Sequence, residues 1–161
     1  MKKLFLIIIT FTSSILYSQD WTELNTIITL NNEICKNLIE VRFLQGDEKS
    51  NSEIKTIYLP GKLKVKTEDI EKLTNNEIKA ISIKVIVPIS NEKGVKYIDY
   101  IIPNINFNLL MTDYFILKIY DLSDKKLKKQ YYPLEGKCYT FEFDSPLQSI
   151  NRVKKKDNGT D

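Results

Sequence analysis

The sequence predicts a mainly β protein, built as a single antiparallel β-sandwich of about seven strands. Three observations support this fold class. From residue 54 onward apolar and polar residues alternate, the apolar runs are rich in β-branched and aromatic side chains, and short polar turns separate them. The chain has 161 residues, enough for one domain with its own hydrophobic core. An N-terminal helix and one short internal helix complete the prediction, and an α+β fold is the alternative.

The segment that follows Trp21 carries two competing patterns. Its apolar side chains recur at helical spacing, and Asp20 and Glu23 have the spacing of a capping box. From Ile39 to Phe43, however, apolar and polar residues alternate as they do in a strand. We therefore expect a helix over about the first half of this segment and then a strand. The alternative is strands throughout, with "TIITL" (26–30) as the first.

The middle of the chain contains two short strands and a short helix. "IKTIYL" (54–59) and "KLKVK" (62–66) flank the turn dipeptide Pro60-Gly61. Thr67 is placed to cap a helix over "EDIEKL" (68–73), whose first-turn acids complement the helix dipole.

Two longer strands follow, and each is expected to end at a proline. Ile81, Ile83, Val85 and Val87 alternate with other residues, of which Ser82 and Lys84 are polar, and Pro88 closes this run. "VKYIDYIIP" is rich in β-branched and aromatic residues and closes at Pro103.

The last strands are expected to form a hairpin and one further strand. "YFILKIYDL" (114–122) and "LKKQYYP" (127–133) are separated by four polar residues, which indicates a hairpin. "KCYTFEFD" (137–144) places Tyr139, Phe141 and Phe143 on one face and polar residues on the other. From Ser145 we expect an extended tail.

The first residues resemble a secretory signal rather than a membrane span. Lys2 and Lys3 precede an apolar run over residues 4–16, which is shorter than the ~20 residues that a spanning helix needs. Cleavage after Ser18 would leave Gln19 as the first residue, and an uncleaved anchor is the alternative. The expected organisation is therefore a signal peptide (1–18), a β-sandwich domain (19–150) and a flexible basic tail (151–161), with no transmembrane span in the mature chain.

The chain lacks the residues that several classes of catalytic and metal-binding sites need. The chain has no histidine and only two cysteines, which argues against Ser-His-Asp or Cys-His catalysis and against a zinc site. No two of its five glycines lie close enough for a phosphate-binding loop. Arg42 is the only arginine between residues 19 and 150, which makes nucleic-acid binding improbable. We expect no cofactor, metal or nucleotide, and the balance is against an enzyme.

Cys35 and Cys138 are the candidates for a disulfide. An exported chain folds where thiols are often oxidised, and a bridge between these residues would close a long loop and clamp the N-terminal segment onto the sheet. Two unpaired thiols are the alternative, because Cys138 lies on the polar face of its strand while Cys35 lies on an apolar stripe.

Glu142 and Asp144 are the candidate catalytic pair. They are two residues apart on one strand, so both carboxylates project from the same face, at a separation near that of some glycosidases. A solvated outer face of the strand is the simpler interpretation, and it predicts that removing either charge has little effect.

The remaining features carry weaker signals. The nine tyrosines are scattered by strand register and form no obvious platform. The basic run 152–156 has the composition of a segment that contacts an anionic surface, although a solvated tail is the ordinary interpretation. Asn158-Gly159-Thr160 matches a glycan acceptor pattern.

We therefore expect an exported, non-catalytic β-sandwich protein that binds a protein or an envelope component, in the periplasm, on the cell surface or outside the cell. The first alternative is a small carboxylate-dependent hydrolase that acts on polysaccharide. The second is a periplasmic inhibitor or protective protein.

Overall fold

A computed structural model describes residues 20–36, 39–45, 52–75, 80–92 and 94–155. The predicted signal peptide (1–18) and the glycan acceptor pattern lie outside these residues. The elements in chain order are β1 (Trp21–Leu24), β2 (Thr26–Leu30), β3 (Glu33–Ile34), β4 (Glu40–Gln45), β5 (Ser52–Lys55), β6 (Ile57–Leu59), β7 (Lys62–Lys66), α2 (Thr67–Asn75), β8 (Ile81–Asn91), β9 (Gly94–Ile105), η1 (Phe107–Leu109), β10 (Phe115–Asp121), α3 (Lys125–Gln130), β11 (Tyr139–Asp144) and β12 (Ser149–Ile150).

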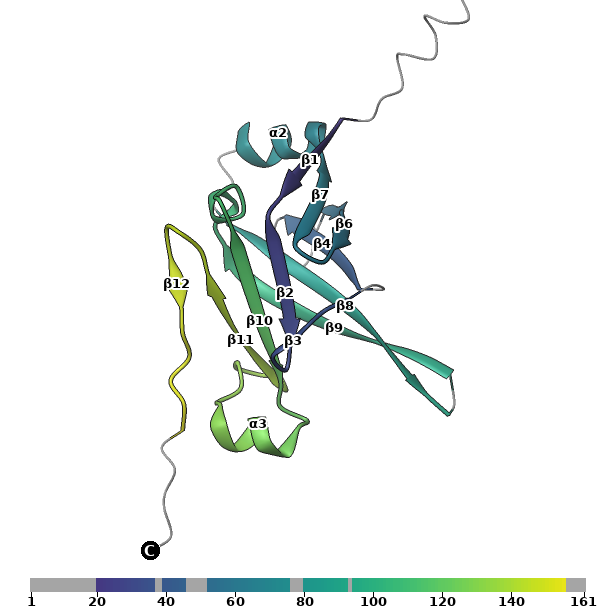
Figure 1. The fold of residues 1–161 in the computed structure, drawn as a ribbon, viewed down its shortest axis with the longest axis vertical. Helices are drawn as coiled ribbons and strands as arrows, with labels where there is room; N and C mark the ends of the chain where they lie inside the picture. Colours follow the sequence, from purple (N-terminus) through teal and green to yellow (C-terminus); the bar gives the residue numbers. More distant parts are fainter. Residues whose placement is uncertain (1–19, 37–38, 46–51, 76–79, 93, 156–161) are drawn as a thin grey trace, which may run out of the picture.

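The fold is mainly β, as predicted, but it is not a single seven-stranded sandwich. The described strands form three sheets, in the orders β1-β7-β6, β12-β11-β10-β2-β3 and β5-β4-β8-β9 (Figure 1). The first ten residues of the β region explain the difference. Strand β1 pairs with β7 antiparallel, whereas β2 begins after Asn25 and pairs with β10 in parallel, so one stretch of chain serves two sheets.

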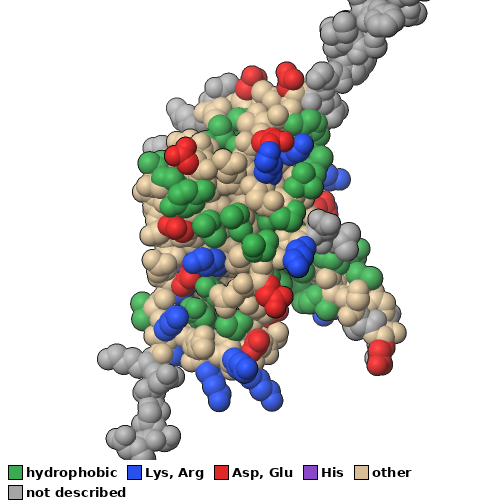
Figure 2. All heavy atoms as spheres, viewed as in Figure 1, with side chains coloured by type: hydrophobic (Ala, Val, Ile, Leu, Met, Phe, Trp, Pro, Cys, Tyr) green, Lys and Arg blue, Asp and Glu red, His purple; other side chains and the backbone are tan. Residues whose placement is uncertain are grey.

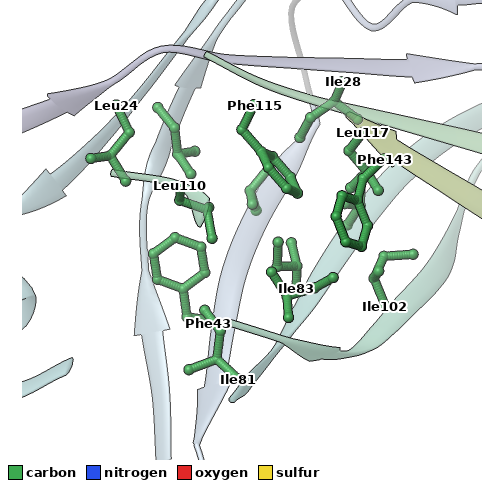
Figure 3. Packing of buried hydrophobic residues seen from close by; sticks show 14 of the residues in the cluster. Leu24, Ile28, Phe43, Ile81, Ile83, Ile102, Leu110, Phe115, Leu117 and Phe143 are labelled. Carbon is green, nitrogen blue, oxygen red and sulfur yellow. The ribbon is translucent and has the colours of Figure 1, made fainter. Parts of the chain in front are cut away.

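The main core lies between the five-stranded and the four-stranded sheets. Figure 3 shows Ile28, Phe115, Leu117 and Phe143 from the first of these sheets facing Phe43, Ile83 and Ile102 from the second. All seven side chains are buried. The alternation predicted for residues 137–144 holds, because Tyr139, Phe141 and Phe143 all belong to this core.

The expected N-terminal helix is wrong, and the segment forms strands as in the alternative, although "TIITL" is the second strand because β1 precedes it. Strand β2 covers "TIITL", and a two-residue turn joins it to β3. The turn residues Asn31 and Asn32 have φ angles of 53° and 70°. These positive angles suit the right-handed twist of a tight hairpin, and asparagine tolerates them better than most residues. The turn and the partner strand β10 outweigh the helical spacing of the apolar residues.

The prolines do not end their strands. Strand β8 continues through Pro88 to Asn91, because β4 pairs with β8 only as far as Ile86 and the proline needs no ladder partner on that side. Strand β9 continues through Pro103 to Ile105, where the register shifts and leaves room for it.

The two internal helices differ in how well the sequence predicts them. Helix α2 (Thr67–Asn75) covers the predicted range 68–73, and Thr67, the expected cap, is its first residue. The expected hairpin over 114–133 is wrong, since α3 occupies its second half. Asp124 caps this helix, and its Oδ1 accepts hydrogen bonds from the backbone N–H groups of Lys126 at 2.7 Å and Leu127 at 3.4 Å.

The segment after β12 folds back along α3. The backbone N–H of Lys155 donates to the carbonyl of Gln130 at 2.8 Å, and Lys154 forms an isolated bridge with Tyr131. Residues 151–155, which the sequence assigns to the tail, thus lie against the domain; residues 156–161 lie outside the described part. No helix in the described ranges is long and apolar enough to cross a membrane.

Candidate functional site

The predicted carboxylate pair does not form an open site. Glu142 and Asp144 share a face of β11, as expected, but Glu142 is only 8% exposed. Its Oε2 accepts a hydrogen bond from the Tyr120 hydroxyl at 2.9 Å, and its Oε1 accepts one from the backbone N–H of Arg152 at 3.0 Å. The solvated face expected for Glu142 is therefore wrong, because the segment 151–155 covers it. In this arrangement Glu142 acts as a buried hydrogen-bond acceptor.

The predicted disulfide is absent, and both thiols are free. Cys35 continues the pairing of β3 with β2, whereas Cys138 immediately precedes β11. Strands β2 and β10 lie between these positions. Three strand spacings amount to roughly 14 Å, twice the largest separation that a disulfide bridges. Cys35 is buried, which raises the pKa of its thiol to about 11, and Cys138 is exposed.

Buried tyrosines link neighbouring segments through hydrogen bonds of their hydroxyl groups and through ring stacking. Tyr58 accepts a hydrogen bond from the backbone N–H of Ile28 at 3.0 Å, and the Tyr100 hydroxyl donates to Asp121 Oδ2 at 2.8 Å. Tyr120 stacks on Tyr131 with ring centroids 4.4 Å apart. The expectation that the tyrosines form no continuous platform agrees with this scatter.

Metal-ligating residues do not gather in the described part of the chain, where no group of three histidine, cysteine, aspartate or glutamate side chains is found.

The hairpin of β8 and β9 projects from the rest of the described fold (Figure 1). Figure 1 shows these strands running together beyond the other strands and ending in a turn. Strand β9 forms the end of its sheet and is 12 residues long, whereas the strands at the other sheet ends have two to four residues. Natural proteins usually keep edge strands short, because a long edge pairs readily with another chain.

One tyrosine reveals which backbone groups of β9 face outward. The hydroxyl of Tyr139 accepts a hydrogen bond from the N–H of Ile101 and donates one to its carbonyl, each at 2.8 Å. Both groups of Ile101 therefore point away from β8. In an antiparallel ladder the two groups of a residue face the same neighbour and the side alternates along the strand. Asp99, Tyr97 and Val95 consequently present their N–H and C=O groups to the outside as well.

The register supports this assignment. Tyr97 lies opposite Pro88 in β8, and proline has no N–H to donate across the pair. No other strand of the described residues pairs with the outer edge of β9. Three alternate residues thus have backbone donors and acceptors available, and we name Val95, Tyr97 and Asp99 the β9 edge.

The opposite edge of the hairpin differs. Beyond Ile86, strand β8 has no β4 neighbour, but Pro88 removes the first outward donor there. A shallow hollow of about 260 Å³ lies beside it, lined by Ile34, Cys35 and Val87 among others. This side offers apolar contact but little main-chain pairing.

The side chains of the β9 edge are exposed and largely apolar. Val95 and Tyr97 are 56% and 64% exposed, and Asp99 is held by Lys84 at 3.0 Å. Figure 2 shows hydrophobic side chains along the projecting hairpin. The edge therefore combines free backbone groups with a valine and a tyrosine that can contact a partner.

Comparison of the chain with protein-family models, with curated proteins and with solved structures finds no match.

Sequence reasoning recognised β9 as a strand but missed the β9 edge. A strand pattern shows which side chains alternate, not which neighbour is missing. One signal was available: Pro88 occurs inside a run that otherwise has strand character, which favours an outer position for that part of β8.

Proposed function

We propose that this protein is an exported, non-catalytic binding protein that captures an extended segment of another protein at the β9 edge. The observation that carries the proposal is the row of outward N–H and C=O groups at Val95, Tyr97 and Asp99 on a long, projecting edge strand. Addition of a strand to such an edge is a recurring mode of peptide recognition.

The chemistry of the edge suits an extended polypeptide. Each of the three residues can donate one hydrogen bond to an incoming strand and accept one from it, and a net contribution of about 0.5–1.5 kcal/mol is typical of each bond. These backbone hydrogen bonds do not depend on the side chains of the bound segment. Selectivity would come from Tyr97 and Val95, whose exposed side chains contact alternate residues of the partner.

The inhibitor or protective alternative uses the same surface. A projecting, convex hairpin is also suited to occupying a groove of an incoming enzyme, and the captured segment would then belong to that enzyme. The hydrolase alternative has less support, because both oxygens of Glu142 accept hydrogen bonds from the protein itself.

Export is part of the proposal. The intact mass of the protein recovered from outside the cytoplasm should correspond to a chain that begins at Gln19. If the full chain were recovered from the cytoplasm alone, the proposed export would be wrong, and with it the proposed binding of an envelope component.

A paired substitution tests the β9 edge. Tyr97→Pro removes an outward N–H without removing a bond to β8, whereas Tyr97→Ala removes the same side chain and keeps the N–H. Peptides selected from a random display library on the wild-type protein should bind Tyr97→Pro at least about tenfold more weakly than Tyr97→Ala. Their binding should also slow amide hydrogen exchange at Val95, Tyr97 and Asp99.

The comparison is repeated at the other exposed apolar residue of the edge. Val95→Pro should likewise bind the selected peptides more weakly than Val95→Ala. Selected peptides that bind all four variants equally, or that protect amides elsewhere and leave the β9 edge unchanged, would show that recognition does not use this edge.

A further inference from the structure

Two basic segments that are separate in the sequence meet at one end of the molecule. The first comprises α3 and the loop after it, and the second is the segment that folds back along α3. The backbone N–H of Lys155 donates to the Gln130 carbonyl, and its Nζ donates to the Lys128 carbonyl, each at 2.8 Å. We name the resulting surface the basic end; its members are Lys125, Lys126, Lys128, Lys129, Lys137, Arg152, Lys154 and Lys155.

The positive charge of the basic end is only partly balanced. Four acids adjoin these segments: Asp121 and Asp124 precede α3, Glu135 lies in the loop after it, and the buried Glu142 accepts a hydrogen bond from the backbone of Arg152. Elsewhere in the described ranges Arg42 and five lysines form ion pairs, but no cation of the basic end does. Lys and Arg side chains project from the end of the molecule that carries α3 (Figure 2). The surface therefore carries an excess positive charge that faces solvent.

Apolar side chains lie among these cations. Val153, between Arg152 and Lys154, is 81% exposed, and Tyr132 is 59% exposed. The Nζ of Lys155 lies 4.9 Å from the centre of the Tyr132 ring. An exposed aromatic ring and an aliphatic side chain next to lysines are suited to the boundary between lipid headgroups and water.

We propose that the basic end docks on a membrane surface that contains anionic lipids. The charges are complementary, and lysine attracts such a surface as a point charge without the paired geometry by which arginine recognises one particular phosphate. Tyr132 and Val153 supply apolar contact at the level of the headgroups. This second surface is independent of the β9 edge, so either one can fail without the other.

The test is co-sedimentation of the full chain with vesicles. Vesicles of phosphatidylcholine with about one third phosphatidylglycerol should retain the protein, and raising the NaCl concentration from about 0.05 M to 0.5 M should weaken binding at least about tenfold. Binding to pure phosphatidylcholine vesicles measures all apolar contributions, including that of the run at 4–16, and is subtracted.

Two double variants of equal charge separate position from net charge. Lys125 and Lys126 lie in the first turn of α3, where glutamate is compatible with the helix dipole, so K125E/K126E should keep the helix. K36E/K55E makes the same charge change at two exposed lysines outside the basic end. We expect K125E/K126E to weaken binding to the anionic vesicles at least about fivefold and K36E/K55E to weaken it less than about twofold. Circular dichroism checks that both variants fold.

Three results would overturn the proposal. The first is equal loss in the two double variants, which would indicate net charge alone. The second is binding to neutral and anionic vesicles alike. The third is salt-sensitive binding to soluble polyphosphate with no retention by vesicles, which would make the basic end a site for a soluble polyanion. A Tyr132→Ala variant with about threefold weaker vesicle binding and unchanged polyphosphate binding would support the membrane.

Discussion

At the scale of single residues, tyrosine hydroxyls supply hydrogen bonds that the sheets leave open. Tyr139 pairs with both backbone groups of Ile101, and Tyr58 with the N–H of Ile28. A buried backbone group without a partner costs free energy, so each hydroxyl stabilises the strand it reaches. Glu142 has the corresponding role for the hydroxyl of Tyr120.

We expect Glu142→Ala to lower the free energy of unfolding by about 1–3 kcal/mol, because it leaves the Tyr120 hydroxyl and the Arg152 N–H without their acceptor. Asp144→Ala on the same face, where the side chain is partly exposed, should change it by less than about 0.5 kcal/mol. Urea denaturation of the two variants measures the difference. Equally small changes in the free energy of unfolding would indicate that Glu142 lies on a solvated face, as the sequence predicts.

The two thiols should differ in reactivity. Cys35 is buried and the pKa of its thiol is raised to about 11, so it is both shielded and protonated at neutral pH, whereas Cys138 is exposed. Iodoacetamide at about pH 8 should modify Cys138 in the native protein and Cys35 only after denaturation. Mass spectrometry of the labelled peptides reads out both sites. If no thiol reacted under these conditions, the predicted disulfide between Cys35 and Cys138 would be supported instead.

At the scale of elements, turns and missing neighbours decide where the strands end. The Asn31-Asn32 turn converts an apparent helix into the hairpin of β2 and β3. Pro88 and Pro103 remain inside strands because neither position has to donate a backbone hydrogen bond to a neighbouring strand. Local propensity is overruled in one case by a turn and a partner strand, and in the other two by the absence of a ladder bond at the proline.

Substitution at Asn32 tests the turn. Its φ of 70° should make Asn32→Val destabilising by about 1–2 kcal/mol, because a β-branched side chain is strained at positive φ. Asn32→Gly should be neutral or slightly stabilising. Glu33→Val, at the next residue in extended β3, is the control and should be tolerated. Thermal unfolding of the three variants gives the ranking, and a tolerated Asn32→Val would contradict the turn geometry.

At the scale of the whole molecule, the segment 151–155 completes the domain. It covers Glu142, and the Arg152 Nε donates to the Phe141 carbonyl at 3.1 Å. It also brings the basic end together. The same short segment therefore serves both the stability of the five-stranded sheet and the charge of one surface.

A chain that ends at Ile150 should be less stable by roughly 2–4 kcal/mol, because it loses the hydrogen bonds of Arg152 and Lys155 to the domain. A chain that ends at Lys155 keeps all of these bonds and is the control. Chemical denaturation compares the two, and equal stabilities would show that the segment contributes nothing to the fold.

The whole protein should lose stability in alkali. Burial raises the pKa of the Cys35 thiol from 9.0 to about 11, and it also raises the pKa of Tyr58, Tyr100, Tyr120 and Tyr139 above 10.0. A raised pKa means that the folded state favours the neutral form. The stabilisation is therefore complete below pH 9 and is lost as pH rises, first through Cys35 and then through the tyrosines.

The melting temperature should consequently fall between pH 9 and 11, and Cys35→Ala should flatten the first part of that fall. The contribution of Cys35 alone is roughly 2–3 kcal/mol when the thiol is fully ionised in the unfolded chain. Melting curves that coincide for the two proteins across this range would exclude a buried thiol.

The sequence by itself determined the features that depend on neighbours along the chain. Alternation placed Tyr139, Phe141 and Phe143 on the core face of β11, and a threonine ahead of acids placed the start of α2. Only the tertiary structure decided the parallel pairing of β2 with β10, the exposed β9 edge, the burial of Glu142 and the gathering of the basic end. The reason is that a period of two residues records which side a residue faces, whereas the partner strand and the segment that covers that side come from far along the chain and leave no local pattern.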